Sequence, residues 1–244
     1  MVSVRPRSTP SLVVVAAGLI LALSACAPEP TASAPSPTFA APALKSSEGP
    51  TPAPGTTAPP LRVVTIGDSL MSGYNLAPEE AWPVLLGDRA HLALTNLACP
   101  GMGFVVQGGC GTTYAGFVPA VAALQPQLVV VESSSNDFWE DGDEIRSDTS
   151  DTVSQIHDAA PDARIVGLST IWNDDPDVPD DTAVTSDALR DAVDEVGGTF
   201  IDVGQPLVGH PEWMQDDDVH PTARGQRAIE QTVMSALQDA DVLP

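Results

Sequence analysis

The chain has 244 residues, of which 43% are hydrophobic and 18% charged, and its formal net charge is −23, from Lys+Arg 10 against Asp+Glu 33. Nucleic acids and anionic lipid headgroups are bound by clustered cations, so this acidic balance argues against both as partners. Residues 61–244 are long enough for one domain with a sizeable core, and we expect that domain to be a monomer.

The N-terminus is typical of an export signal. Arg5 and Arg7 supply positive charge, and a short apolar run follows them, ending in Leu-Ser-Ala-Cys at residues 23–26. The run is too short to serve comfortably as a permanent membrane helix. The tetrapeptide resembles a bacterial lipobox, which implies removal of residues 1–25 and a diacylglycerol on Cys26. We therefore expect a protein that is lipid-anchored to the outer face of the plasma membrane; an ordinary secretory signal is the alternative.

Residues 26–60 are rich in Pro, Ala, Ser and Thr and have almost no large apolar side chains. Such a segment cannot bury enough surface to offset the entropy lost on ordering. We interpret it as a semi-extended tether that reaches at most ~100 Å. A spacer whose length has no selected value is equally compatible with the sequence.

Beyond the tether, five short runs are apolar on consecutive residues rather than on alternate ones. They span residues 61–66, 92–97, 127–132, 163–168 and 199–203. Strands that are buried on both faces have this pattern, which is typical of a parallel sheet covered by helices.

Helical patterns lie between these runs. Pro78 and the two glutamates after it predict a helix over residues 78–88, with the proline in the first turn and acids at the positive end. Valine and alanine recur every four residues over 184–196, and a similar stripe runs from Ile229 to Leu237. Strand and helix thus alternate. This order predicts a three-layer α/β/α sandwich with the active site at the carboxyl ends of the strands.

The first predicted strand runs directly into Gly-Asp-Ser-Leu at residues 67–70. Ser69 is the candidate nucleophile, because a serine hydroxyl attacks an ester once a neighbouring imidazole can take its proton. The alternative is an ordinary turn or cap residue. Met71 stands where a Gly-x-Ser-x-Gly elbow has its second glycine, so the common α/β-hydrolase elbow is disfavoured.

Two further blocks follow later strands. Asn-Leu-Ala-Cys-Pro-Gly occupies residues 96–101, and Ser-Ser-Asn-Asp occupies residues 134–137. If Cys26 is lipidated, Cys99 and Cys110 are the two cysteines that remain, and in an oxidising compartment we expect them to form a disulfide. Two free buried thiols are the alternative.

Near the end of the chain, Asp217 stands three residues before His220. His220 is the candidate general base, because this spacing lets a single turn bring the carboxylate to the imidazole nitrogen that faces away from the serine. Asp217 is the favoured orienting acid, and Asp216 and Asp218 are the alternatives.

These blocks, in this order, resemble those of the SGNH (GDSL-type) hydrolase family over residues 61 to 240. The resemblance implies a sandwich with a five-stranded parallel sheet, as in flavodoxin-like folds, and a carboxylic ester hydrolase with Ser69, Asp217 and His220 as its triad. The implied triad mechanism needs neither a metal nor a cofactor. We predict none, since no cluster of His, Cys and carboxylate residues other than the triad stands out.

The resemblance also implies three donors to an oxyanion hole. These are the backbone amides of Ser69 and Gly101 and the side-chain amide of Asn136. Gly103 is the alternative donor if the loop is shifted, and Asn136 could instead cap a turn. Losing one such donor costs on the order of 10² to 10³ in turnover.

Three positions depart from the family pattern. Ala98 and Ser134 stand where the family usually has glycine, and Pro100 stands where it usually has a small polar residue. A Cβ or a proline ring at these places would narrow the cleft or shift the oxyanion loop, so the acyl group accepted is left open.

Residues 137–151 and 174–181 are rich in aspartate. Neither segment has the ligand spacing of a calcium loop, so solvated acidic loops are favoured over a calcium site. Trp139 and Trp213 each lie within a few residues of a predicted catalytic block and are candidates for lining the cleft. Core packing is the alternative for both.

Three functions are compatible with these residues. The first is an extracellular, lipid-anchored esterase that removes a small acyl group, such as acetyl, from a carbohydrate or lipid ester. The second is an acyltransferase in which a sugar hydroxyl intercepts the same acyl-serine. The third is a lipoprotein that binds glycan without turnover.

Overall fold

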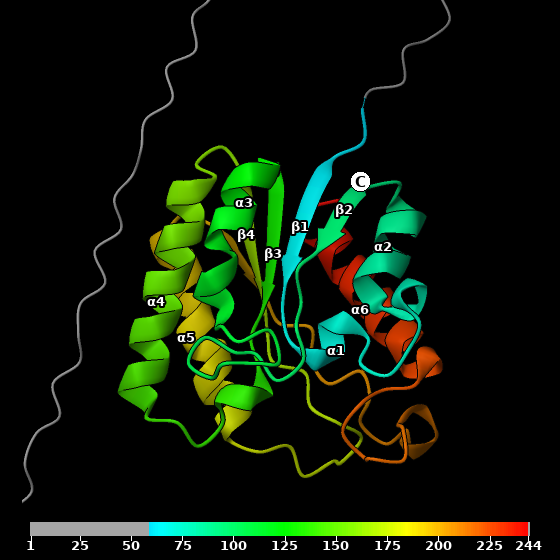
Figure 1. Ribbon diagram of the computed structural model, residues 1–244. Coiled ribbons are helices and arrows are strands. Elements are labelled where there is room, and N and C mark those ends of the chain that lie inside the picture. The colour runs from blue at the N-terminus through cyan, green and yellow to red at the C-terminus, as the bar shows by residue number, and fades with distance from the viewer. Residues whose placement is uncertain (1–58, 244) are drawn as a thin grey trace, which may run out of the picture. The chain divides into compact units, whose positions relative to one another are not determined.

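The computed structural model describes residues 59–243, which form a parallel sheet between two layers of helices (Figure 1). The predicted signal peptide, Cys26 and all but the last two residues of the tether lie outside the described residues. The strands are β1 (Arg62–Ile66), β2 (Ala93–Asn96), β3 (Leu128–Glu132), β4 (Arg164–Leu168) and β5 (Thr199–Ile201). All pairs are parallel, in the order β2-β1-β3-β4-β5. The predicted five-stranded sandwich is therefore confirmed.

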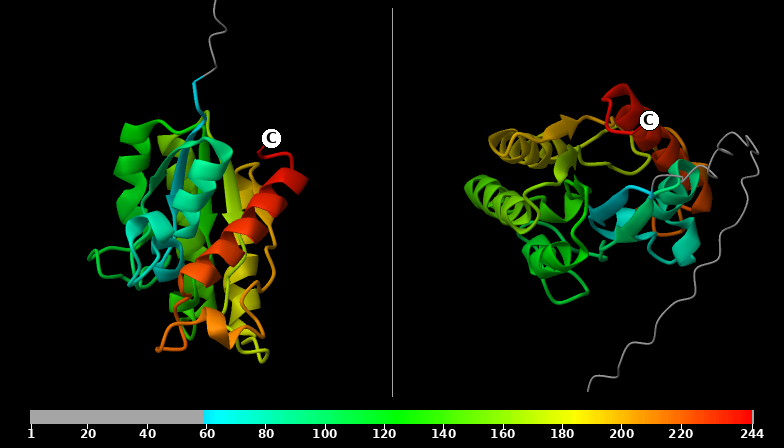
Figure 2. Two further views of the ribbon diagram at one scale, coloured as in Figure 1. Left: turned by 90° about the vertical axis from the view of Figure 1, so that its right-hand side faces the viewer. Right: turned by 90° about the horizontal axis from the view of Figure 1, so that it is seen from above.

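Helices α3, α4 and α5 cover one face of the sheet, and α2 and α6 cover the other (Figures 1 and 2). The α-helices are α1 (Ser69–Ser72), α2 (Trp82–Ala90), α3 (Val118–Leu124), α4 (Gly142–Ala159), α5 (Asp181–Glu195) and α6 (Ala223–Asp239). Four short 3₁₀ turns are η1 (Pro78–Glu80), η2 (Tyr114–Phe117), η3 (Ser135–Asp137) and η4 (Pro211–Trp213). No helix among residues 59–243 has the length and apolar character needed to cross a bilayer.

One predicted helix has different bounds. The segment 78–88 is split into η1 and α2, because Ala81 is extended, with ψ of 135°, and separates the two. Pro83 lacks an N–H and is tolerated only in the first turn of a helix, so α2 begins at Trp82 rather than continuing from η1. The fifth strand is also shorter than predicted and ends at Ile201.

The strands are apolar on consecutive residues because each contributes to two cores. On β3, Leu128 and Val130 pack with the α2 and α6 side, while Val129 and Val131 pack with the α3, α4 and α5 side. Successive side chains of a strand point to opposite faces, so burial of both faces removes the polar alternation of a half-exposed sheet.

The strand order places a topological switch point between β1 and β3. The chain leaves β1 toward β2 on one side, and later leaves β3 toward β4 on the other. The two connections diverge at this point, and open α/β sheets bind their ligands at such a point, outside the carboxyl ends of the strands. Ser69 follows β1 and the block 134–137 follows β3, so both predicted blocks lie at this edge of the sheet.

Candidate active site

The turn after β1 holds Ser69 at the first position of α1. The carboxylate of Asp68 caps this helix, since its Oδ1 accepts from the Leu70 amide at 2.8 Å. Gly67 is required where the chain turns, because a Cβ there would lie 2.6 Å from the sulfur of Met71. Met71 is fully buried, so the residue that departs from the hydrolase elbow serves the core.

Asp217 and His220 are joined directly. Asp217 Oδ2 lies 2.7 Å from His220 Nδ1, and Asp217 Oδ1 accepts from the backbone amides of Val219 at 3.1 Å and His220 at 3.0 Å. The His220 backbone amide, followed by its side chain, lowers the pKa of Asp217 to about 2. With Nδ1 donating to this carboxylate, Nε2 is left as the acceptor that a general base needs.

The alternatives to Asp217 have other positions. No hydrogen bond joins the side chain of Asp216 or Asp218 to His220 within residues 59–243, and the carbonyl of Asp218 accepts from the Asn173 side chain at 3.1 Å. The structure therefore brings Asp217, and not its two neighbours, to the imidazole.

The backbone around His220 is fixed by pairing. Met214 and Pro221 form an antiparallel bridge, and the Gln215 amide donates to the His220 carbonyl at 2.8 Å. The side chain of Gln215 then donates to the carbonyl of Tyr74 at 2.9 Å. The loop that carries the base is thereby tied to the segment that follows the nucleophile.

Tyr74 connects the two ends of the triad, and the sequence analysis did not identify it. Its backbone amide donates to the Ser69 carbonyl at 3.1 Å, and its ring lies 4.4 Å from the imidazole of His220. Ser69 Oγ makes no hydrogen bond to His220 in the described residues; such bonds are often long before substrate binds.

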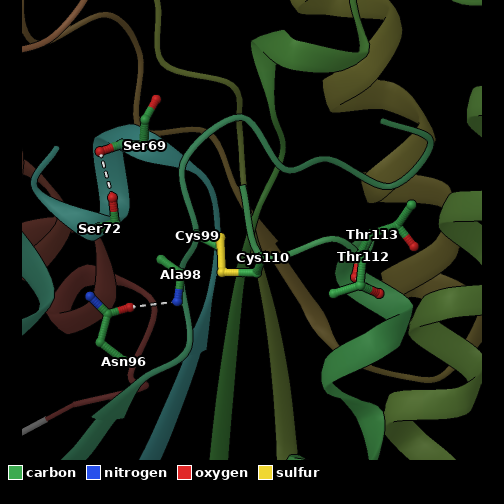
Figure 3. The surroundings of a disulfide bond; sticks show 8 residues. All are labelled: Ser69, Ser72, Asn96, Ala98, Cys99, Cys110, Thr112 and Thr113. Carbon is green, nitrogen blue, oxygen red and sulfur yellow. Dashed lines mark hydrogen bonds between the residues drawn. A yellow bond between two sulfur atoms is a disulfide. The ribbon is translucent and has the colours of Figure 1, made fainter. Parts of the chain in front are cut away.

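The loop after β2 presents Gly101. Cys99 and Cys110 form a disulfide across this loop, as predicted (Figure 3). The Met102 amide donates to the Cys99 carbonyl at 3.3 Å around a turn in which Gly101 has φ of 75°. Proline second and a left-handed glycine third are what a type II turn requires, so Pro100 suits this loop and does not distort it.

The carboxylate of Asp137 holds the next part of the same loop. It accepts from three successive backbone amides, those of Phe104 at 2.7 Å, Val105 at 3.1 Å and Val106 at 3.0 Å. A Cβ at Gly103 would lie 2.2 Å from Asp137 Oδ1, so only glycine leaves room for this contact. The Gly103 amide itself donates to the Val106 carbonyl, which disfavours Gly103 as the alternative oxyanion donor.

Asn136 lies between this loop and the nucleophile turn. Its Nδ2 contacts the Met102 carbonyl at 3.0 Å, Ser134 Oγ at 3.0 Å and Asp68 Oδ2 at 3.4 Å. An amide nitrogen has two hydrogens, so an incoming oxyanion would compete with the longest of these three contacts. The Asn136 backbone amide also donates to Ser134 Oγ, so the residue that caps this 3₁₀ turn is Ser134 and not Asn136, as the alternative had it.

The other departures from the family pattern are also accommodated. Ser134 is fully buried, so it does not narrow the cleft. Ala98 packs against the core on the α2 and α6 side, and its amide donates to the side chain of Asn96 at 3.0 Å (Figure 3).

The two tryptophans that were candidates for lining the cleft differ in exposure. Trp139 is 83% exposed and has φ of 66°, whereas the ring of Trp213 is partly buried and stacks on His210 at 3.6 Å. His210 Nδ1 also lies 3.2 Å from Glu212 Oε1. Trp139 therefore faces solvent close to the site, and Trp213 packs in the loop that leads to the triad.

The first acidic segment was expected to be a loop, but its residues 142–151 form the first part of α4, and acidic side chains of both segments make structural contacts. Asp141 caps α4 by accepting from the amides of Asp143 and Glu144, and Asp175 accepts from the Asp177 amide. No group of three or more metal-ligating side chains converges anywhere in residues 59–243.

Comparisons with known proteins agree with this geometry. A family model described as the GDSL-like Lipase/Acylhydrolase family matches residues 65–228. No curated protein matches the chain.

Several solved structures have a similar fold. The psychrotrophic esterase EstA from Pseudoalteromonas sp., inhibited by monoethylphosphonate, is 18% identical with a TM-score of 0.58, over 73% of this chain and 97% of that one. A family two carbohydrate esterase from Cellvibrio japonicus is 16% identical with a TM-score of 0.60, over 77% and 63%. The salicylyl-acyltransferase SsfX3 from a tetracycline biosynthetic pathway is 18% identical with a TM-score of 0.62, over 78% and 57%.

The fold places Ser69 at the β1–β3 switch point, and Tyr74 ties the Ser69 turn to a histidine that an aspartate supports. The chain belongs to the GDSL-like lipase/acylhydrolase family and is a carboxylic ester hydrolase.

Proposed function

We propose that the protein is a cell-surface serine esterase that removes a small acyl group, such as acetyl, from a carbohydrate ester. Ser69 is the nucleophile, His220 the general base and Asp217 the residue that orients the imidazole. The observation that carries these roles is the 2.7 Å contact between Asp217 and His220, which Tyr74 ties to the Ser69 turn.

The reaction proceeds in two steps. In the first, Ser69 Oγ bonds to the carbonyl carbon of the ester while its proton passes to His220 Nε2, and collapse of the tetrahedral intermediate expels the alcohol, which takes that proton. In the second, water adds to the acyl-serine by the same route and releases the acid and free Ser69. Asp217 remains ionised throughout and stabilises the imidazolium.

The oxyanion formed in each step meets three proposed donors. Ser69 supplies a backbone amide at the start of α1, and Gly101 supplies a second from its turn in the disulfide loop. Asn136 Nδ2 is the third, through the hydrogen that it shares with the distant Asp68 oxygen.

A neutral carbohydrate is the substrate class that best fits the rim. Three of the large hydrophobic side chains that are exposed among the described residues lie within a few positions of the catalytic blocks: Tyr74 at 39%, Trp139 at 83% and Val219 at 50%. Aromatic faces of this kind pack on the apolar faces of sugar rings. The adjoining segments carry many aspartates, which disfavour an anionic substrate or lipid surface.

The leaving alcohol belongs on the Tyr74 side. His220 returns its proton to that alcohol, so the alcohol oxygen must lie beside the imidazole. Tyr74 borders the same imidazole, since the two ring centroids lie 4.4 Å apart at a tilt of 42°, and the exposed Val219 precedes His220 in sequence. We therefore assign the sugar to this side. The lipid anchor on Cys26 would hold the enzyme on the outer face of the plasma membrane.

An acyltransferase is a second candidate, because the similar fold SsfX3 is described as an acyltransferase. It would use the same acyl-serine, with a sugar hydroxyl in place of water.

The test is labelling of the purified protein with a fluorophosphonate, together with release of p-nitrophenol from its acetate ester. We expect Ser69→Ala and His220→Ala to lose both signals, while His210→Ala, the matched histidine control, keeps them. A folded wild-type protein that neither labels nor turns over would refute the enzyme and leave glycan binding without turnover. Transfer to an added sugar exceeding hydrolysis would favour the acyltransferase.

A further inference from the structure

A buried hydroxyl joins the nucleophile turn to the proposed oxyanion asparagine. Ser134 lies between β3 and η3 and is fully buried. Its Oγ donates to Asp68 Oδ2 at 2.6 Å. The same oxygen accepts from the backbone amide of Asn136 at 3.0 Å and from the side-chain Nδ2 of Asn136 at 3.0 Å. One hydroxyl therefore uses both its donor and its acceptor capacity in this network.

These contacts determine the orientation of the Asn136 carboxamide. The Met102 carbonyl, Ser134 Oγ and Asp68 carboxylate all lie around Nδ2, and the carbonyl and the carboxylate can only accept. A flipped amide would point its oxygen at these acceptors, which is electrostatically unfavourable. Ser134 is the polar side chain that contacts the amide nitrogen and Asp68 at once.

Asp68 supplies the other anchor of the network. Its carboxyl group is fully buried; Oδ1 accepts from the Leu70 amide at 2.8 Å, and Oδ2 faces Ser134. Burial raises the pKa of Asp68, and the hydrogen bond from Ser134 opposes this rise. Because Asp68 immediately precedes Ser69 and caps its helix, the Ser134 hydroxyl ties the ends of β1 and β3 together at the nucleophile.

We propose that Ser134 is a positioning residue, which holds the Asn136 carboxamide at the oxyanion hole by linking it to Asp68. This inference rests on the proposed function, because it gives a role to Asn136 during turnover. A glycine at this position, which the family usually has, would offer none of these three contacts, so the device is a feature of this chain.

The test is a double-mutant cycle in the full-length protein, with p-nitrophenyl acetate as substrate. Ser134→Ala removes only the hydroxyl. We expect it to lower kcat about 10- to 100-fold, less than the 10² to 10³ for loss of a donor outright, and to leave KM within about twofold. Asn136→Ala should lower kcat more. In the Asn136→Ala background, Ser134→Ala should then change kcat less than about threefold, because the residue through which it acts is gone.

Two further variants separate positioning from folding. Ser133→Ala is the matched control, since Ser133 is equally buried and its hydroxyl contacts Thr170 Oγ1 at 2.8 Å, outside this network. It should lower the melting temperature without lowering kcat. Ser134→Gly also lacks the hydroxyl, and glycine is well tolerated as a helix cap. The kcat of Ser134→Gly therefore tests the inference if Ser134→Ala does not fold.

The outcomes are distinct from those for the proposed function. Wild-type kcat in folded Ser134→Ala or Ser134→Gly would overturn the inference, and so would losses that multiply independently in the double variant. In both cases the proposed function stands, because Ser69→Ala remains inactive and Asn136→Ala keeps its lowered kcat. If Asn136→Ala has wild-type kcat, the proposed role of Asn136 fails and this inference fails with it. If Ser69→Ala retains turnover, the proposed function itself fails.

Discussion

Loss of the disulfide should reduce both stability and catalysis. The bond joins Cys99 to Cys110, 11 residues apart, so it restricts the unfolded chain by closing a loop of about a dozen residues. Chain-entropy estimates for a loop of this size give about 3 kcal/mol of stabilisation. For a domain of this size, each kcal/mol shifts the melting temperature by roughly 2–4 °C, so we expect a decrease of roughly 6–12 °C.

The catalytic effect follows from the position of the loop. Gly101 lies inside the closed segment, two residues after Cys99. Its amide should lose its fixed position when the bond is absent. The Asp137 carboxylate still holds residues 104–106, so we expect a partial loss of kcat, less than the 10² to 10³ for removal of a donor.

The assay compares wild-type protein with the Cys99→Ala, Cys110→Ala double variant by calorimetry and by p-nitrophenyl acetate hydrolysis. Wild-type protein treated with a reductant is the second comparison and should approach the variant, since Cys110 is exposed although Cys99 is buried. A double variant with the melting temperature of the wild type would refute the stability estimate. Unchanged kcat in a destabilised variant would show that the loop keeps Gly101 in place without the bond.

Three other predictions follow. Asp217→Asn should lower kcat strongly. Because the folded pKa of Asp217 is lowered to about 2, the small stabilisation by its carboxylate is present above about pH 4 and is lost as the pH falls toward 2. The melting temperatures of variant and wild type should therefore converge near pH 2. Glu132→Gln should raise the melting temperature at pH 7. Burial raises the pKa of Glu132, so ionisation of this carboxyl group lowers the stability of the folded protein above the unfolded pKa of about 4.3. Equal melting temperatures at pH 7 would contradict this prediction. Gly103→Ala should displace Asp137 and lower both kcat and melting temperature, whereas Gly142→Ala, with its nearest contact at 3.6 Å, should not.

Much of the fold was predictable because its cause is local. Burial of both faces makes each strand apolar on consecutive residues, so the five strands could be located to within two residues at either end. The helix over 78–88 was wrong in its bounds, because the extended Ala81 separates η1 from α2 and sequence periodicity does not reveal such a break.

The candidate site was predicted unevenly. Ser69, Asp217 and His220 lie in short blocks whose spacing reflects contacts within one turn, and the 2.7 Å pairing of Asp217 with His220 is such a contact. The ring contact between Tyr74 and His220 joins residues 146 positions apart, and no local spacing encodes it. The same holds for the Asp137 carboxylate, which binds amides more than 30 positions earlier in the chain.

The sequence by itself indicated the five strands, three of the helical segments, the residue types at each strand end and the pairing of the two cysteines in the domain, but it indicated neither α3 nor α4. Only the tertiary structure decided what the departures from the family pattern do. Pro100 was expected to disturb its loop but completes a turn, and Ser134 was expected to narrow the cleft but is buried against Asp68 and Asn136. The physical reason is that a side chain's effect depends on the direction in which its Cβ points and on which groups of distant strands meet it there. Both are set when β1 and β3 pair in the sheet.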